Sequence, residues 1–220
     1  MGRGAWTVPA GEYEEVNRKD HWDKVYASKA AEDLTWFQAE PVVSLDLIHQ
    51  TGISVQDGIL DVGAGASLLP LHLLKEGFED VSVLEVSQNA LKVAKHQLGQ
   101  RAGSVSWLEA DLIGFEPSRR WVLWHDRAVF HFLTRPEDRD EYCRALRAAL
   151  TPDGHVIIAT FALGGPSKCS GLDCERYSPE SLAAVLGAGF QFEGSIEEAH
   201  ETPKGGTQNF VYSWFQRVSS

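Results

Sequence analysis

The sequence predicts an α/β fold: a doubly wound, mostly parallel sheet with helices on both faces. From residue 58 to residue 186, short apolar segments of strand length alternate with segments of helical periodicity. Such alternation is typical of parallel strands joined by helical crossovers. The last two apolar segments, 190–196 and 209–215, have no helix between them, so we expect one of these two strands to be antiparallel.

The predicted strands are short runs rich in apolar and β-branched residues. Five of them precede the final pair and lie at residues 58–62, 81–85, 105–108, 121–125 and 155–161. A turn around residues 203–206 joins the final pair. No internal repeat and no second domain is visible in the 220 residues, which is an ordinary length for one domain.

The predicted helices of this region begin and end at residues with capping or turn chemistry. Gly77 is expected to end the first of them, because glycine is favoured just past helix ends. Ser87 is the expected N-cap of the second, and a turn over 151–154 (TPDG) ends the third. The four helices are expected over 68–76, after Ser87, from Pro136 and over 179–186.

The N-terminal part differs in pattern from the rest of the chain. Residues 1–19 are polar and glycine-rich, so we expect a loose arm there. Helical spacing of apolar residues after this arm predicts two helices, separated by a loop near 33–40, with Pro41 at the start of the second. We therefore expect an N-terminal arm with added helices over 1–50 and a core over 51–220.

The composition excludes several classes of protein. The chain carries 20 Lys and Arg against 31 Asp and Glu, a formal net charge of −11. An acidic surface repels phosphate backbones, so we expect no nucleic acid partner. No apolar run is long enough to span a bilayer, the first residues lack a secretory signal, and three cysteines are too few for a disulfide framework. We expect a cytoplasmic protein that binds no membrane.

The segment after the first strand of the core predicts a site for an adenosine-containing cofactor. Gly63 and Gly65 follow that strand and allow the backbone to turn tightly against a ligand. Glu85 ends the next strand, where a carboxylate can accept hydrogen bonds from both ribose hydroxyls. A dinucleotide would need a third glycine where Leu68 stands. S-adenosylmethionine has no pyrophosphate, and its cationic methionine part suits the acid that precedes the loop, Asp61.

The chain resembles the class I, seven-β-strand S-adenosylmethionine-dependent methyltransferases over roughly residues 20–217. Residues 60–65 (LDVGAG) are similar to the family's first motif, with Ser67 where a third glycine is often found. Residues 83–87 resemble the ribose-binding second motif, and residues 124–127 resemble the fourth, at the strand end that faces the methyl group. The resemblance implies a Rossmann-like sheet of seven strands that ends in a hairpin, with S-adenosyl-L-methionine as cofactor.

Residues 109–112 resemble the segment that lines the adenine, which implies that Asp111 or its neighbouring backbone meets the exocyclic amine. Each predicted cofactor residue also has a purely structural alternative. Gly63 and Gly65 could serve only a tight turn, Glu85 could cap a helix, and Asp111 could cap a turn.

The strand end at His125 and Asp126 supplies the candidate catalytic residues. Methyl transfer is an in-line displacement, and a base is needed only when the acceptor arrives protonated. His125 or Asp126 could serve there; alternatively, His125 points into the flank of the sheet and Asp126 caps the next turn. Arg127 is expected as a structural or electrostatic partner. His131 is a candidate substrate contact, with a hydrogen-bonded structural histidine as the alternative.

Aromatic residues of the N-terminal part resemble the helix-and-loop lid of many family members. Trp22 and Trp36 could cover the cofactor or attract its sulfonium, and Tyr26 could contact the substrate; alternatively, all three pack the added helices onto the sheet. Cys169 follows the fifth strand at the edge where active-site loops emerge, so it is a candidate substrate contact. With Cys174 it makes no strong zinc pattern, and no metal is expected.

The leading prediction is an enzyme that transfers the methyl group of S-adenosylmethionine to a small-molecule heteroatom nucleophile, such as a thiol or related chalcogen compound. The alternative is a protein-lysine N-methyltransferase, because the WDxxY start, the later Trp-Phe pair and the Asp-Arg after the fourth strand are similar to some seven-strand lysine enzymes. A third hypothesis is a non-catalytic, cofactor-binding regulatory protein, against which the candidate groups on both sides of the site argue.

Overall fold

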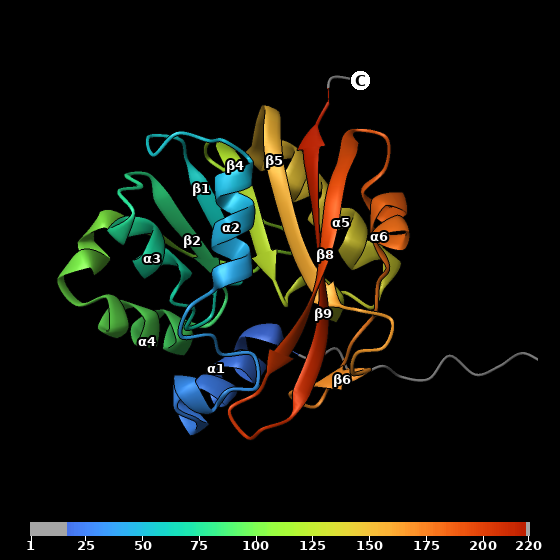
Figure 1. Cartoon of the computed structure of the whole chain (residues 1–220). Helices are drawn as coiled ribbons and strands as arrows, with labels where there is room; N and C mark the ends of the chain where they lie inside the picture. The colour runs from blue at the N-terminus through green and yellow to red at the C-terminus, as the bar shows by residue number, and fades with distance from the viewer. Residues whose placement is uncertain (1–16, 219–220) are drawn as a thin grey trace, which may run out of the picture.

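The computed structural model describes residues 17–218, which build one twisted sheet with helices on both faces (Figure 1). The sheet has seven strands in the order β3-β2-β1-β4-β5-β9-β8. Their bounds are β1 Ile59–Val62, β2 Val81–Glu85, β3 Val105–Glu109, β4 Trp121–Arg127, β5 Leu150–Phe161, β8 Phe190–Glu201 and β9 Thr207–Arg217. The predicted doubly wound α/β fold with seven strands is confirmed.

The strand directions follow the predicted pattern. The strands β1 to β5 pair in parallel, with β1 between β2 and β4. The strand β9 pairs antiparallel with β5, and β8 pairs antiparallel with β9. Thus β9 runs against the other six strands, as expected from the missing helix between the last two. The strand order reverses between β1 and β4, and open α/β sheets bind ligands at the carboxyl ends of such a switch point.

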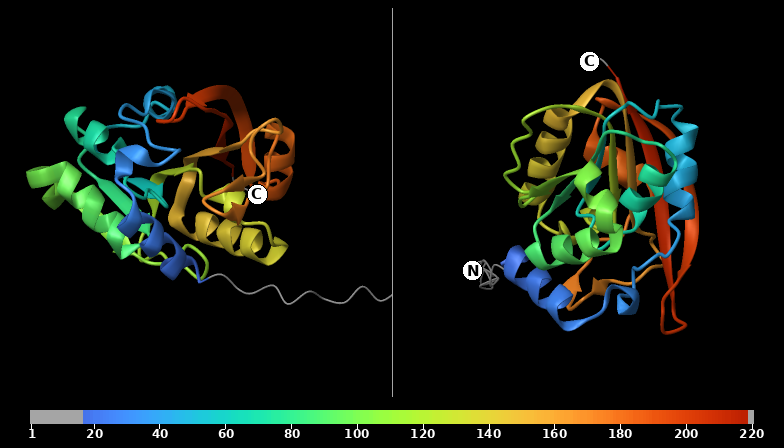
Figure 2. Two further views of the ribbon diagram at one scale, coloured as in Figure 1. Left: turned by 90° about the horizontal axis from the view of Figure 1, so that it is seen from below. Right: turned by 90° about the vertical axis from the view of Figure 1, so that its left-hand side faces the viewer.

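Six α-helices accompany the sheet within residues 17–218. Helices α2, α3 and α4 pack on one face, and α5 and α6 pack on the other (Figure 2). Helix α1 lies at the end of the sheet where the turn between β8 and β9 is also found (Figure 1). The helices are α1 Arg18–Ser28, α2 Val42–Gln50, α3 Leu69–Lys75, α4 Gln88–Leu98, α5 Pro136–Ala149 and α6 Pro179–Leu186. Short elements are the 3-10 helices η1 Ala31–Asp33, η2 Gly99–Ser104 and η3 Phe130–Phe132, and the hairpin of β6 Lys168–Cys169 and β7 Leu172–Asp173.

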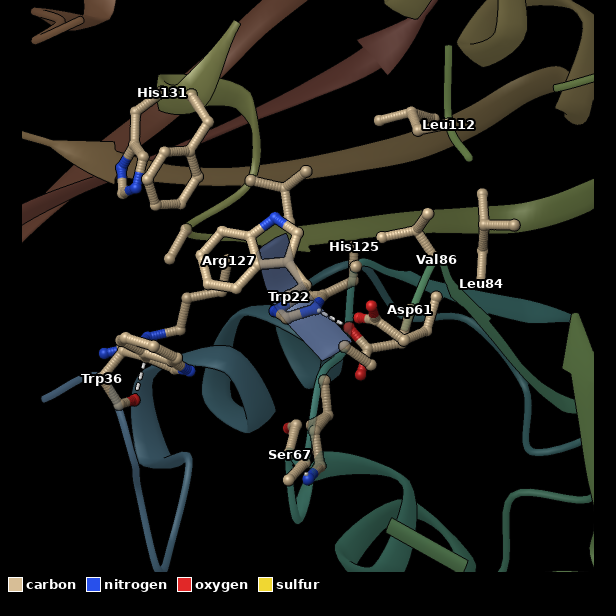
Figure 3. Close-up of a pocket in the computed structure, with 18 of the residues that line it drawn as sticks. Trp22, Trp36, Asp61, Ser67, Leu84, Val86, Leu112, His125, Arg127 and His131 are labelled. Atoms are coloured by element: carbon tan, nitrogen blue, oxygen red, sulfur yellow. Dashed lines mark hydrogen bonds and ion pairs between the residues drawn. The ribbon is translucent and has the colours of Figure 1, made fainter. Parts of the chain in front are cut away.

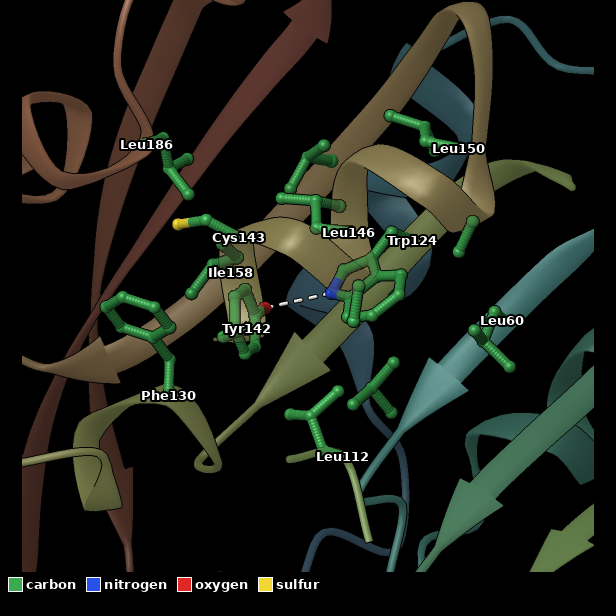
Figure 4. Close-up of a cluster of buried hydrophobic side chains, with 14 of the residues drawn as sticks. Leu60, Leu112, Trp124, Phe130, Tyr142, Cys143, Leu146, Leu150, Ile158 and Leu186 are labelled. Carbon is green, nitrogen blue, oxygen red and sulfur yellow. Dashed lines mark hydrogen bonds between the residues drawn. The ribbon is translucent and has the colours of Figure 1, made fainter. Parts of the chain in front are cut away.

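Successive side chains of β1 and β4 point to opposite faces of the sheet, and this alternation decides which cluster each joins. Leu60 and Trp124 pack against α5 and α6 (Figure 4). There the Trp124 indole N–H donates a hydrogen bond to the Tyr142 hydroxyl at 2.8 Å. Ile59 and Leu123 pack against α2 and α3 on the other face. On β4 the next two residues, His125 and Asp126, therefore also face opposite sides, and His125 lies on the same side as Asp61 of β1.

One predicted turn is wrong. Residues 151–154 lie inside β5, which begins at Leu150 directly after α5. A register shift against β4, between Trp121 and Leu123, accompanies them, and Asp153 has a φ of 59°. Four residues of β5, 151–154, thus stand opposite the single residue Val122 of β4, so the Thr-Pro-Asp-Gly sequence makes a bulge of three extra residues inside the strand and not a separate turn before it.

The last two strands are longer than predicted. They pair from Phe190 with Arg217 to Glu201 with Thr207. Much of the outer strand, β8, is exposed and polar, so apolar alternation does not mark its full length. The turn expected around 203–206 closes this hairpin.

The loose arm expected over 1–19 falls mostly outside the described residues. From Asn17 the chain departs from that expectation, because Asn17 caps α1: its side chain accepts a hydrogen bond from the Asp20 backbone N–H at 3.1 Å. The division of the chain at residue 50 stays a prediction. No helix within residues 17–218 is long and apolar enough to cross a membrane.

Candidate active site

A cavity opens at the carboxyl ends of β1, β2 and β4, where the strand order reverses (Figure 3). It encloses about 1300 Å³ of space between its walls, open solvent at its mouth included. Most predicted site residues line it: Trp22, Tyr26, Trp36, Asp61, Gly63, Glu85, Asp111, His125, His131 and Cys169. Gly65 and Asp126 are not part of its wall.

The loop after β1 requires glycine at two positions. Gly63 and Gly65 both have a φ of 57°, a conformation that strains residues with a Cβ. A Cβ at Gly63 would overlap the Val129 side chain, and a Cβ at Gly65 would overlap the Tyr26 hydroxyl. The close approach seen at these glycines is that of the protein's own side chains, and their contact with a cofactor stays a prediction.

Glu85 ties this loop to the end of β2. Its Oε2 accepts a hydrogen bond from the Gly65 backbone N–H, and its Oε1 accepts one from the Ser87 backbone N–H, both at 2.8 Å. Burial raises the pKa of Glu85 to about 7, and the nearby Asp61 acts in the same direction. Each carboxylate oxygen can accept a further hydrogen bond, so Glu85 keeps the capacity to bind two hydroxyl groups.

Asp61, His125 and Ser44 form a buried chain of hydrogen bonds. Asp61 Oδ1 lies 2.7 Å from His125 Nδ1, and His125 Nε2 lies 2.9 Å from Ser44 Oγ. Both ring nitrogens of His125 are therefore engaged. Asp61 Oδ2 has no hydrogen-bond partner among the described residues, although it is buried. Sequence analysis missed Ser44, whose signal was a lone serine on the apolar face of a short helix.

Asp126 faces away from the cavity, which corrects the expectation that it stands beside His125 at the reacting groups. Neighbouring side chains on a strand point to opposite faces. The Asp126 carboxylate instead accepts hydrogen bonds from the Tyr142 hydroxyl at 2.9 Å and from the Val129 backbone N–H at 3.0 Å. Burial raises the pKa of Asp126 to about 7. These contacts match the alternative that Asp126 caps the turn after β4.

Asp111 lies at the mouth of the cavity. Its side chain is 37% exposed and 3.7 Å from the Arg18 guanidinium. Its Oδ1 accepts a hydrogen bond from the Ile113 backbone N–H at 2.9 Å. Asp111 thus caps a turn and also borders the cavity, and its contact with adenine stays a prediction.

Aromatic rings cover the cavity from the N-terminal side. The Trp22 ring meets Trp36 edge-on at 5.9 Å and Phe132 at 5.1 Å between centroids. Tyr26 meets Trp36 at 6.4 Å. The aromatic cover, defined as Trp22, Tyr26, Trp36 and Phe132, therefore packs as one group, and it also faces the cavity. Phe132 was not singled out from the sequence.

The segment next to this cover is fastened to the C-terminal hairpin. The Gln38 side chain donates a hydrogen bond to Glu198 Oε1 at 2.8 Å. His200 Nε2 lies 2.9 Å from the Thr35 carbonyl oxygen. Arg127, at the end of β4, donates a hydrogen bond to the Trp36 carbonyl at 2.9 Å. The cover thus depends on the last strands of the sheet.

His131 lines the side of the cavity that lies away from Asp61, and Cys169 also lines the cavity. Figure 3 shows His131 and Arg127 on one side of the Trp22 ring and the pair of Asp61 and His125 on the other. His131 is fully buried and stacks on Phe161 at 4.3 Å between centroids. Burial raises the pKa of Cys169 and raises that of the neighbouring Cys174 to about 12, so both are kept as thiols.

Known proteins share the sequence features of this core. Residues 59–154 match a family described as a methyltransferase domain. The zebrafish (Danio rerio) EEF1A lysine methyltransferase 2 is 25% identical over 162 residues, which cover 66% of this chain and 69% of that protein. The mouse (Mus musculus) eEF1A lysine and N-terminal methyltransferase is 23% identical over 188 residues, 85% of this chain. The match covers 25% of the mouse protein's length.

Solved structures share the fold. One, described under the conversion of a disulfide bond into a thioacetal group during echinomycin biosynthesis, has a TM-score of 0.73 at 19% identity and covers 91% of each chain. The Burkholderia thailandensis 1,6-didemethyltoxoflavin-N1-methyltransferase, with substrate and S-adenosylhomocysteine bound, has a TM-score of 0.64 at 20% identity and covers 91% of this chain and 84% of its own. Residues 59–154 carry a methyltransferase domain, and the chain has the seven-stranded class I fold of S-adenosylmethionine-dependent methyltransferases.

Proposed function

We propose that this methyltransferase modifies a small-molecule heteroatom nucleophile that gives up its proton readily, with thiols and related chalcogen compounds as the first class. The observation that carries the proposal is the state of the two histidines in the cavity wall. Both ring nitrogens of His125 are hydrogen-bonded, and His131 Nδ1 accepts a hydrogen bond from the Phe161 backbone N–H, so a neutral His131 carries its proton on Nε2 and neither ring offers a basic nitrogen to the substrate.

The acidic side of the cavity suits the cofactor. Asp61 Oδ2 is buried and has no hydrogen-bond partner among the described residues, so it can accept one from the ammonium of the methionine part. Glu85 can receive the ribose hydroxyls, and Asp111 borders the place left for adenine. When bound, S-adenosylmethionine supplies the activated methyl group. The protein positions it and excludes water.

The two histidines disfavour an acceptor that arrives as an ammonium ion. His125 is held between Asp61 and Ser44, and His131 accepts a hydrogen bond from the Phe161 backbone N–H at 3.3 Å through Nδ1. A thiol has an ordinary pKa of about 8.5, against about 10.4 for a lysine amine. A thiol therefore loses its proton far more readily and depends less on a base.

Protein-lysine methylation is the second candidate, because both curated relatives carry lysine methylation in their names. A lysine enzyme must remove a proton from the ammonium and admit a side chain from outside. Neither histidine of the cavity wall offers a basic nitrogen for that proton. Small molecules therefore remain our first proposal.

The experiment follows a labelled methyl group. The protein is incubated with S-adenosylmethionine labelled in the methyl group, and with thiols, primary amines or a protein extract in separate reactions. We expect label in the thiols. Label in protein bands with none in thiols would contradict the proposal and support lysine methylation.

Two variants show that the labelling depends on this site. Glu85→Ala should abolish most transfer, because the ribose loses its carboxylate partner. Glu141→Ala is the matched control: Glu141 is a surface glutamate of α5 that pairs with Arg144 at 2.8 Å, and its loss should leave transfer unchanged.

A further inference from the structure

We propose that His131 and Arg127 form a binding site for a carbonyl or carboxylate oxygen of the substrate that is methylated. Such an oxygen accepts hydrogen bonds and donates none. The site rests on the proposed function, because it places the acceptor in the same cavity as the cofactor. It goes further by naming a chemical group that the acceptor carries besides the atom that is methylated.

His131 presents a single N–H group to the cavity. Its Nδ1 accepts the hydrogen bond from the Phe161 backbone N–H, so a neutral ring carries its proton on Nε2. Burial, with Arg127 adding to the effect, lowers the pKa of His131 to about 3, so the ring is neutral at physiological pH. Nε2 is buried and has no hydrogen-bond partner among the described residues.

Arg127 holds a second donor nearby. Its Nε donates a hydrogen bond to the Tyr212 hydroxyl at 2.8 Å, and its Nη1 donates one to the Trp36 carbonyl. Its Nη2 is buried and makes no hydrogen bond within the described residues. The guanidinium lies 4.5 Å from the centre of the Phe210 ring, and the His131 ring lies 6.3 Å from the same ring. The two donors therefore flank one aromatic side chain of the cavity wall.

Charges around Arg127 decide which ligands fit. Glu198 Oε2 lies 3.6 Å from Arg127 Nη2 and already accepts a hydrogen bond from the Tyr212 hydroxyl at 3.1 Å. Glu198 balances the charge of Arg127, so a neutral carbonyl fits as well as a carboxylate. An ammonium group has only donors and would face two donors with no acceptor for its own hydrogens.

A buried donor without a partner costs free energy, and two residues in the wall of the same cavity, His131 and Arg127, each keep one. The stacked position of His131 fixes the direction of its N–H, because the ring is held by Phe161 on one face and by the hydrogen bond at Nδ1. The arrangement is therefore preformed for an oxygen acceptor and selects against an amine at that end of the substrate.

The test uses three probes of equal chain length that lack a nucleophilic sulfur: butyrate, butyramide and butylammonium. Each is titrated by calorimetry into the protein saturated with S-adenosylhomocysteine. We expect butyrate and butyramide to bind about tenfold or more tightly than butylammonium. Equal or tighter binding of butylammonium would overturn the proposal, and this comparison requires no variant.

The variant His131→Phe keeps the aromatic ring against Phe161 and removes the Nε2–H. We expect it to lose about tenfold in affinity for butyrate and butyramide, while the affinity for S-adenosylhomocysteine is unchanged. The control is His155→Phe, because His155 lies at the middle of β5 and outside the cavity wall. Unchanged butyrate and butyramide affinity in His131→Phe would overturn the site.

Labelling of matched thiols separates this proposal from the proposed function. Thiols that carry a carboxylate, an amide or an ammonium group at equal distance are compared as acceptors. If none is methylated while the probes bind as expected, the oxygen site stands and the thiol class is wrong. If all three are methylated at equal rates, the thiol class stands and the oxygen site is wrong.

Discussion

Cofactor binding should be coupled to the loss of a proton from Glu85. The pKa of this carboxyl is raised to about 7 by burial, so at pH 6 about one molecule in ten carries the charged form. Hydroxyl groups of a ribose donate hydrogen bonds, and these favour the carboxylate over the carboxylic acid. Binding therefore lowers the pKa of Glu85, and affinity rises with pH until the proton is already lost in the free protein.

The magnitude follows from that fraction. Well below pH 7 the affinity for the cofactor should change about tenfold per pH unit, and the change becomes smaller near pH 7 and levels off above it. Between pH 6 and pH 8 the total gain is about tenfold. At pH 7 binding should release about half a proton, because half of the Glu85 carboxyls are then protonated.

Calorimetry with 5′-methylthioadenosine measures this effect cleanly. The probe keeps the adenosine and lacks the ammonium of the methionine part, so it does not report on Asp61. Titration in two buffers with different ionisation enthalpies gives the number of protons released. Glu85→Gln should bind more weakly at pH 8 and show no pH dependence, whereas Glu141→Gln, on the surface of α5, should behave like the wild type. A wild-type affinity that is constant from pH 6 to pH 8 would refute the reasoning.

Three further predictions concern single side chains. The pKa of the Asp126 carboxyl is about 7 in the folded protein and about 3.9 in the unfolded chain. Its contribution to stability is therefore full below pH 4 and is lost as the pH rises through 7. In urea unfolding, the free energy of unfolding of Asp126→Asn should fall less than that of the wild type between pH 4 and pH 8, by up to about 4 kcal/mol. Gly65→Ala should lower the free energy of unfolding by at least about 1 kcal/mol, and adding Tyr26→Phe should recover part of the loss, since the new Cβ overlaps the Tyr26 hydroxyl; no recovery would exclude that overlap as the cause. If the Trp22 ring attracts the sulfonium, Trp22→Ala should lower the affinity for S-adenosylmethionine about twofold to thirtyfold more than the affinity for S-adenosylhomocysteine. Equal losses of affinity for the two ligands, measured by calorimetry, would mean that Trp22 only packs against its neighbours.

Much of the fold could be predicted because its signals are local. The strand 81–85 and the helix 179–186 were expected with their observed bounds, since each is an apolar run or stripe bounded by residues with turn or cap chemistry. The turn expected over 151–154 is a bulge inside β5, because the pairing of β4 with residues on both sides of it decides whether the extra residues end the strand or remain within it. No local pattern reports on that partner.

The candidate site shows the same division. Asp61, Glu85 and the glycine loop were found from spacing, because parallel strands bring their carboxyl ends together. The alternation of β4 already indicated that His125 and Asp126 face opposite sides, but the side that holds the cavity is set by the packing of helices. Ser44 reaches His125 across 81 positions of sequence, and such a contact depends on where α2 docks.

The bonds between the cover and the C-terminal hairpin have a consequence for how the protein is made. The bonds from Gln38 and to Thr35 join positions 160 and 165 apart in the chain, so neither can form until synthesis has passed His200. Contacts between distant positions also form late in folding, because a long loop must close first. A nascent chain that still lacks β8 and β9 can already contain β1 to β5, but its aromatic cover is not yet held over the cavity by these hydrogen bonds. The aromatic cover is therefore fixed over the cavity in one of the last steps of synthesis and folding.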